Sequence, residues 1–275
     1  MAVSNEPTPA SRSALTRVLR VGAVGVVGGA ILAGMAIPVV AGMGKASEVA
    51  SAQIGALPDE LATPPLPVRT VMLDADGNKI ATLFEENRLE VPLNQISQNM
   101  QDAIVAVEDE RFYEHHGVDL KGLIRAQLEN TASGSIQQGA STLTMQYVRN
   151  VLVTAARTPE ERQAALERTT ARKLQEIRYA VQLERELSKD EILNRYLNIA
   201  YFGSGAYGVE AASRRYFGHS AKKMTVSESA LLAGLVQSPV GYDPLVNPDA
   251  AKVRRDAVLS VMESQDFITP DEYDK

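Results

Sequence analysis

Helix-start signals recur along this 275-residue chain and constrain its fold more than any other feature. In three places, at Thr158, Ser188 and Thr225, a hydroxyl residue stands three positions before a Glu. The hydroxyl and the carboxylate can then satisfy each other's free backbone amides at a helix start. Asn247 and Thr269 are followed directly by proline, which suits the first helical position because the amide hydrogen it lacks would have no partner there. A mainly α-helical fold is therefore predicted for the residues after position 92.

The N-terminal region has a different character. Arg12, Arg17 and Arg20 precede an uncharged stretch from Val21 to Gly44 that is rich in Val, Ala and Gly. About 20 apolar residues suffice to cross the hydrocarbon core of a bilayer, and positive charges mark the cytoplasmic side. We expect a single-pass protein of the cell membrane, with residues 1–20 in the cytoplasm, 21–44 in the membrane and the catalytic domain outside. The alternative is a cleaved signal peptide, but the apolar run is longer than a signal core.

Turn and linker residues divide the remaining chain. Residues 45–67 are small, polar and proline-bearing, as in a juxtamembrane linker. A β-hairpin is expected at 68–91, with its turn at 74–78, followed by a helical domain at 92–264. Residues 265–275 begin a further region, and the helix signalled at Thr269 is cut short at Lys275. We therefore expect this sequence to be the front part of a longer polypeptide.

Charge and cysteine content narrow the possible functions. The formal net charge is −6, which does not indicate general nucleic-acid binding. The chain has no cysteine, which excludes disulfides and thiol chemistry.

Glu108 is the first candidate for chemistry. Met100, Ala103, Ile104 and Val107 recur at helical spacing, and Glu108 continues their stripe. A carboxylate at the edge of an apolar face loses solvation, which raises its pKa and makes it a usable proton acceptor near neutral pH.

Five segments carry a longer pattern. The first is E-D-x-x-F-x-x-H-x-G at 108–117, and the second is G-x-S-T-x-T-x-Q-x-x-R-N at 139–150. The third is R-K-x-x-E at 172–176, the fourth is K-x-x-I-L-x-x-Y-L-N at 189–198, and the fifth runs from Glu228 to Pro244. In this order they resemble the peptidoglycan glycosyltransferases (glycosyltransferase family 51), the glycan-polymerising domain of class A penicillin-binding proteins. The chain departs from that pattern at Met145, where the family has Gln, and at Arg149, where it has Lys.

The resemblance implies a lysozyme-like, mainly α-helical catalytic domain with a small membrane-associated subdomain, to which residues 151–153 could contribute. It also implies that this chain is the N-terminal fragment of a bifunctional enzyme of the actinobacterial type. Lipid II and the lipid-linked glycan chain would be the substrates, polymerised with inversion at C1 and release of undecaprenyl diphosphate. The membrane and divisome or elongation proteins would be the partners.

The resemblance further implies site residues. Glu108 would be the general base and Glu176 the second carboxylate, and both should face one cleft. Glu176 would orient cations, support the leaving group, or hold a divalent cation such as Mg²⁺ at the diphosphate. The substrate-binding residues would be Asp109, Phe112, Ser141, Thr142, Gln146, Arg149, Asn150, Arg172 and Lys173.

Each segment alone has a plainer explanation. The second could be a Ser/Thr-rich helix start, and Arg172 and Glu176 could form a surface pair worth about 0.3 kcal/mol. If the third segment is helical, Arg172, Lys173 and Glu176 share one side, and the buried stripe is expected at Leu174, Ile177, Ala180, Val181, Leu183 and Leu187.

Two other classes of function remain open. A lysozyme-like hydrolase or lytic transglycosylase also needs an acid in an apolar pocket, but it has no diphosphate to hold with cations. A non-catalytic membrane-anchored scaffold would be expected to lack the key acids, and both are present. No transpeptidase activity is expected, because no Ser-x-x-Lys pair typical of a penicillin-reactive transpeptidase is recognised.

Overall fold

The computed structural model describes residues 60–119, 121–122, 141–167 and 169–274. Contacts divide the chain into residues 1–57 and 58–275, and the described residues all fall in the second unit. The predicted cytoplasmic tail and membrane span lie outside the described residues. Within the part that the structure describes, no helix is both long enough and apolar enough to cross a membrane.

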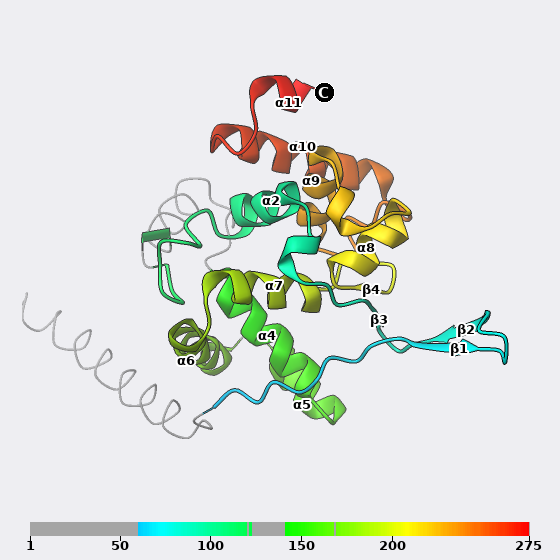
Figure 1. The fold of residues 1–275 in the computed structure, drawn as a ribbon. Helices are drawn as coiled ribbons and strands as arrows, with labels where there is room; N and C mark the ends of the chain where they lie inside the picture. Colours follow the sequence, from blue (N-terminus) through cyan, green and yellow to red (C-terminus); the bar gives the residue numbers. More distant parts are fainter. Residues whose placement is uncertain (1–59, 120, 123–140, 168, 275) are drawn as a thin grey trace, which may run out of the picture. The chain divides into compact units, whose positions relative to one another are not determined.

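Helices dominate the described residues, as the helix-start signals predicted (Figure 1). In chain order they are α2 (Gln98–Glu108), α4 (Leu143–Ala155), α5 (Pro159–Leu166), α6 (Thr170–Glu186), α7 (Lys189–Ile199), α8 (Val209–Tyr216), α9 (Val226–Leu235), α10 (Pro248–Ser264) and α11 (Pro270–Asp274). Two short 3₁₀ helices, η1 (Leu93–Gln95) and η2 (Ala221–Lys223), connect them to their neighbours.

The three predicted capping boxes are confirmed. Thr158, Ser188 and Thr225 start α5, α7 and α9, and in each the Glu side chain returns a hydrogen bond to the backbone of the cap. Asn247 is the N-cap of α10, but its side chain does not cap the helix. Its amide instead donates to the Val240 carbonyl at 3.4 Å, so proline alone marks this start.

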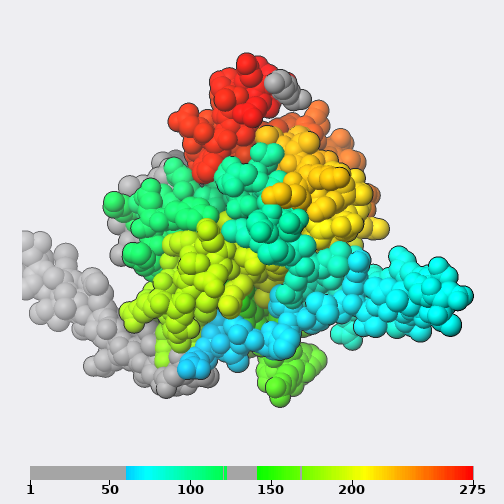
Figure 2. Space-filling model, viewed as in Figure 1, coloured from blue at the N-terminus to red at the C-terminus, as the bar shows by residue number. Residues whose placement is uncertain are grey.

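The predicted hairpin is present but shorter than expected. Strands β1 (Thr70–Leu73) and β2 (Lys79–Leu83) pair antiparallel, with Thr70 opposite Leu83. Their turn is held by the Asp74 carboxylate, which accepts from the backbone amides of Asp76 and Asn78 at 2.9 and 2.7 Å. Figure 2 shows the hairpin in cyan, projecting beside the helices.

Residues after the hairpin join the helical part instead of extending the strands. Strand β3 (Asn87–Arg88) pairs in parallel with β4 (Ala206–Tyr207). Arg88 is 1% exposed; it pairs with the neighbouring Glu86 and also donates to the Asn198 carbonyl at 2.7 Å, far away in the sequence. A buried cation needs such partners. The antiparallel pairing of β1 with β2 ends at Leu83, before the expected hairpin boundary at 91.

Two groups of helices surround the core. Helix α2 packs against α9 and α10, while α4 packs against α5, α6 and α7 (Figure 1). One hydrophobic cluster runs through both groups and includes Ile104 of α2, Val148 of α4, Ile192 of α7, Leu232 of α9 and Met262 of α10. The C-terminal end of α2 and the N-terminal turn of α4 are held together by hydrogen bonds, and the candidate site lies there.

The buried side of α6 differs from the predicted stripe. Ala180 and Leu183 are buried as expected, but Leu174, Ile177, Val181 and Leu187 are only partly buried. The other buried side chains are Glu176 and Tyr179. The helix turns this way because Glu176 meets three cationic side chains, which offset the cost of burying its carboxylate.

Candidate active site

Glu108 is the last residue of α2 and lies half-buried beside α4. Its Oε2 accepts a hydrogen bond from Nε2 of Gln146 at 2.8 Å. Burial raises the pKa of the Glu108 carboxyl above its ordinary value. The Gln146 hydrogen bond and the charge of Arg254 oppose this rise, and the charge of Asp109 adds to it. The direction agrees with the sequence-based expectation of a desolvated proton acceptor.

Asp109 faces inward. It is 7% exposed, and its two carboxylate oxygens lie 2.9 and 3.0 Å from Nε2 of His115. It also accepts from the backbone amide of Leu143, the first residue of α4, at 2.9 Å. Asp109 therefore joins the end of α2 to the start of α4, and its predicted substrate contact stays a prediction.

Phe112 is also a core residue. Its side chain is fully buried, edge-on to Tyr113 with ring centres 5.1 Å apart. The Lys189 ammonium lies 4.5 Å from the centre of the Phe112 ring and 2.6 Å from a Glu184 carboxylate oxygen. No face of the Phe112 ring reaches the surface, so its role here is packing, and its substrate contact stays a prediction.

Thr142 caps α4. Its hydroxyl donates to the Gly117 carbonyl at 2.8 Å and accepts from the Met145 amide at 3.2 Å, and it is 3% exposed. Gly117 has φ +85°, and a Cβ there would lie 2.8 Å from the backbone nitrogen of Val181. Only glycine lets this loop approach α6 so closely. Thr142 thus ties the loop to the helix, and its predicted substrate contact also stays a prediction.

The partly exposed face of α4 carries the other residues of the second segment. Gln146, Arg149 and Asn150 are half-buried and are spaced three and four apart, so they share one side of the helix. Met145, where the family pattern has Gln, is 1% exposed and lies in the core. This buried position is consistent with leaving Met145 out of the predicted site residues.

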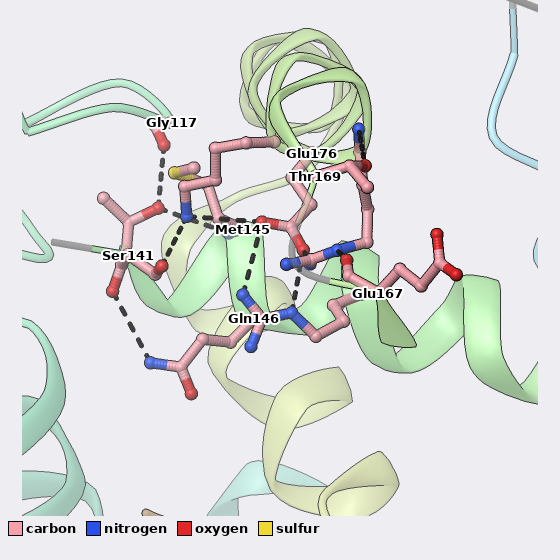
Figure 3. A network of polar contacts seen from close by, with 11 residues as sticks. Gly117, Ser141, Met145, Gln146, Glu167, Thr169 and Glu176 are labelled. Atoms are coloured by element: carbon pink, nitrogen blue, oxygen red, sulfur yellow. Dashed lines mark hydrogen bonds and ion pairs between the residues drawn. The ribbon is translucent and has the colours of Figure 1, made fainter. Parts of the chain in front are cut away.

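Glu176 is the centre of a cationic cluster (Figure 3). Its carboxylate is fully buried and pairs with Arg149 at 2.8 Å, with Lys173 at 3.3 Å and with Arg172. Arg172 also donates to the backbone carbonyl of Glu167. Three cations thus share one carboxylate, which leaves the cluster with an excess of positive charge. This is not the exposed Arg172–Glu176 surface pair that the plainer explanation supposed.

Lys173 connects this cluster to Glu108. Its ammonium donates to the Ser141 hydroxyl, and Nε2 of Gln146 lies 3.5 Å from the Ser141 carbonyl (Figure 3). Burial lowers the pKa of Lys173 and the charge of Glu176 opposes this, while the two arginines lower it further. The two carboxylates therefore belong to one continuous set of polar contacts. A shared cleft stays a prediction that this geometry supports.

Two residues near Glu108 were missed by the sequence reasoning. Tyr196 of α7 is fully buried, and its hydroxyl donates to Oε1 of Gln146 at 3.1 Å. The sequence did offer one indication of Tyr196: its hydroxyl-bearing side chain lies among the apolar residues Ile192, Leu193 and Leu197. Arg254 of α10 acts on Glu108 by its charge, and no local pattern in the sequence connects it to the site.

A cavity of about 320 Å³ opens on another side of α4. Tyr147, Val151 and Thr154 of α4 line it, together with residues 63–66, Glu90 and the α7 residues Asn194, Arg195, Asn198 and Ile199. Neither acid lines this cavity. Val151 is 3% exposed, whereas Leu152 and Val153 are partly exposed, so the membrane contact expected from residues 151–153 stays a prediction.

No preformed divalent-cation site is found among the described residues. They contain no group of three or more His, Cys, Asp or Glu side chains that could hold a metal ion. Both oxygens of Glu176 already contact cationic side chains, which a metal ion would have to displace.

A Ser-x-x-Lys sequence does occur, which corrects the expectation that none would be recognised. It is Ser220-Ala221-Lys222-Lys223. The Ser220 hydroxyl donates to a Glu210 carboxylate oxygen at 3.1 Å and caps η2. These contacts give Ser220 a structural role at a helix start.

Comparison with known proteins identifies the class. Residues 76–263 match the family model described as Transglycosylase, which covers more than half of the chain. The chain therefore belongs to the transglycosylase family, the peptidoglycan glycosyltransferase domain of class A penicillin-binding proteins.

Its relatives are longer proteins. Penicillin-binding protein 1F of Bacillus subtilis (strain 168) is 41% identical over 201 residues, which are 73% of this chain and 27% of that protein. Penicillin-binding protein 1A of Escherichia coli (strain K12) is 43% identical over 201 residues, 73% of this chain and 22% of that protein. The chain spans about a quarter of the length of these curated relatives. A crystal structure of penicillin-binding protein 1A from Haemophilus influenzae matches with a TM-score of 0.40 and 24% identity, covering 76% of this chain and 20% of that one.

Proposed function

We propose that this protein polymerises lipid II into glycan strands, with inversion at C1 and release of undecaprenyl diphosphate. The observation that carries this proposal is the pairing of a desolvated carboxylate, Glu108, with a cationic cluster in one set of contacts. Removing a proton from a sugar hydroxyl and stabilising a departing diphosphate require these two kinds of group close together.

Glu108 would act as the general base. A sugar hydroxyl is a weak nucleophile, so the carboxylate takes the proton of the acceptor 4-hydroxyl as that oxygen attacks C1 of the donor. The bond from C1 to the diphosphate oxygen breaks, and its electron pair leaves with the diphosphate. Burial suits Glu108 to this task, because a raised pKa makes the carboxylate a stronger proton acceptor.

The leaving diphosphate would be held by Arg149, Arg172 and Lys173. Arg149 and Lys173 are about one-third exposed, and Arg172 is less so, which leaves part of the cluster open to a ligand. The guanidinium fork of an arginine suits two phosphate oxygens at once. Among the three roles considered for Glu176, its contacts favour orienting these cations.

A glycan hydrolase is the competing function, and the cationic cluster argues against it. Cleavage of a neutral glycan produces no diphosphate, so an enzyme of that kind gains nothing from several cations beside its second acid. A non-catalytic scaffold is disfavoured for another reason. Burying Glu108 without a role would only cost stability.

The test supplies the purified chain with lipid II and with polymeric glycan in separate reactions. The proposal expects glycan strands from lipid II and no shortening of the polymer. Glu108→Gln should lower lipid II turnover by about a hundredfold or more, the range of general base catalysis, while circular dichroism remains unchanged. Glu85→Gln, at an exposed position, is the matched control. Cut glycan without polymerisation would assign the hydrolase function instead.

A further inference from the structure

A chain of hydrogen bonds crosses three helices to reach Glu108. It begins at Tyr196 of α7, whose hydroxyl donates to Oε1 of Gln146 at 3.1 Å. Nε2 of Gln146, on α4, then donates to Oε2 of Glu108 at the end of α2, at 2.8 Å. Tyr196 is fully buried, so its hydroxyl has no exchange of partners with bulk water.

The phenol and the Ser141 carbonyl, which lies 3.5 Å from Nε2, both favour one orientation of the Gln146 amide. A glutamine side chain presents an acceptor oxygen and a donor nitrogen of nearly equal size, and only the donor end suits an ionised carboxylate. Burial, and then the charge of Glu108, raise the pKa of Tyr196 well above its ordinary value, so the phenol keeps its proton and remains a donor. A donor at Oε1 holds the opposite end, Nε2, against Glu108.

We propose that Tyr196 is a positioning residue that acts through Gln146 to fix the general base. The inference rests on the proposed function and deepens it. The amide occupies Oε2 of Glu108, and among the described residues no side-chain hydrogen bond to Oε1 is found. Oε1 is therefore the oxygen that takes the proton from the acceptor hydroxyl. Tyr196 itself need not touch the substrate.

The same contact tunes the base. An N–H donor stabilises the carboxylate and so lowers the pKa of Glu108, against the rise caused by burial. The other charges that act on this pair are Asp109 beside Glu108, Arg254 from α10, and Arg149 of α4, which acts on Tyr196. Replacing Tyr196 by Phe leaves all three in place, so a change in pH dependence belongs to the hydrogen-bond chain.

The test measures lipid II turnover against pH for the full chain and for Tyr196→Phe, Gln146→Met and the double variant. Tyr196→Phe should lower kcat by about three- to tenfold with little change in KM, the size of one hydrogen bond between neutral groups. The acid limb of the pH profile should move to higher pH, because a base that has lost its donor is protonated more readily. In the Gln146→Met background Tyr196→Phe should have no further effect.

The matched control is Tyr216→Phe, which removes a hydroxyl that donates to the Phe202 carbonyl at 3.0 Å, away from both acids. It should leave the acid limb in place. The inference would be overturned if the acid limb of the pH profile did not move in Tyr196→Phe. It would also be overturned if Tyr196→Phe had the same effect in the wild-type and the Gln146→Met backgrounds. Should Tyr196→Phe fail to fold, Gln146→Met must move the limb in the same direction.

A second readout separates this inference from the proposed function. If the wild-type chain makes no glycan, the proposed function fails, and the titration of Glu108 still tests Tyr196. Carbon NMR of glutamate-labelled protein, with the signal assigned by Glu108→Gln, should give a higher pKa of Glu108 in Tyr196→Phe than in the wild type or Tyr216→Phe. Equal titrations in all three would reject the role of Tyr196.

Discussion

At the scale of single residues, burial of Glu108 has opposite effects on chemistry and stability. The pKa of its carboxyl is raised chiefly by desolvation, so the folded protein holds this proton more tightly than the unfolded chain does. Stability therefore falls as the pH rises from the ordinary carboxyl value of 4.5 through the raised value, and the loss persists at higher pH. The same desolvation that makes Glu108 a stronger base therefore lowers the folding stability at neutral pH.

The first residue-scale prediction follows from this sign. Glu108→Gln should melt at a higher temperature than the wild type at neutral pH, because the amide carries no charge to desolvate. The difference in melting temperature should shrink toward zero as the pH falls below the ordinary carboxyl pKa, because Glu108 is then protonated in both the folded and the unfolded wild-type protein. Thermal melts at several pH values measure this. Glu85→Gln, which is exposed, should show no such pH dependence, and a Glu108→Gln variant that melts lower at neutral pH would contradict the argument.

At the scale of elements, α4 and α6 together form the cationic cluster. Arg149 comes from α4, while Arg172 and Lys173 come from α6, and all three meet on Glu176. Contacts from two helices hold these cations in fixed positions before any ligand arrives. Such preorganised charge stabilises a transition state at little cost in reorganisation.

Arg149→Ala and Arg172→Ala should therefore lower lipid II turnover by roughly ten- to a hundredfold, the value of a desolvated charge-assisted contact of about 1.5–3 kcal/mol. Each variant leaves two cations on Glu176, so the melting temperature should change less than the rate. Arg185→Ala, an exposed arginine in the last turn of α6, is the matched control and should alter neither. Unchanged turnover in both site variants would remove these arginines from the reaction.

Glu176 should behave differently from its cations. Glu176→Gln leaves three cations without their shared counter-ion, and breaking a buried ion pair in this way costs about 3–5 kcal/mol. Chemical denaturation should show this loss, and turnover should fall with it. A stable but inactive Glu176→Gln protein would instead indicate a direct role of the carboxylate in the chemistry.

At the scale of the whole molecule, the reaction requires the catalytic part to lie where its lipid-linked substrates lie. We propose that residues 21–44 anchor the chain, with residues 1–20 in the cytoplasm and the catalytic domain outside, because arginines precede the apolar run. Protease treatment of intact spheroplasts should cleave the region around Glu108 and spare residues near Met1. The reverse pattern of protection would invert this topology.

The sequence by itself determined the features that depend on near neighbours. Cap signals at Thr158, Ser188 and Thr225 predicted helix starts, because a capping box is complete within four residues. The five segments also predicted the family, and the comparison confirmed it. The raised pKa of Glu108 was predictable for the same reason, since its own helix supplies the apolar stripe.

Only the tertiary structure decided which motif residues face inward. Asp109, Phe112 and Thr142 belong to the same family pattern as Glu108. Phe112 nevertheless packs in the core, and Asp109 and Thr142 form hydrogen bonds with the backbone, because α2, α4 and α6 meet around them. Glu176 is buried instead of exposed because cations from two helices converge on it. Tyr196 joins the site across 50 residues of sequence. Contacts of this range depend on how helices pack, and helix periodicity alone leaves that packing open.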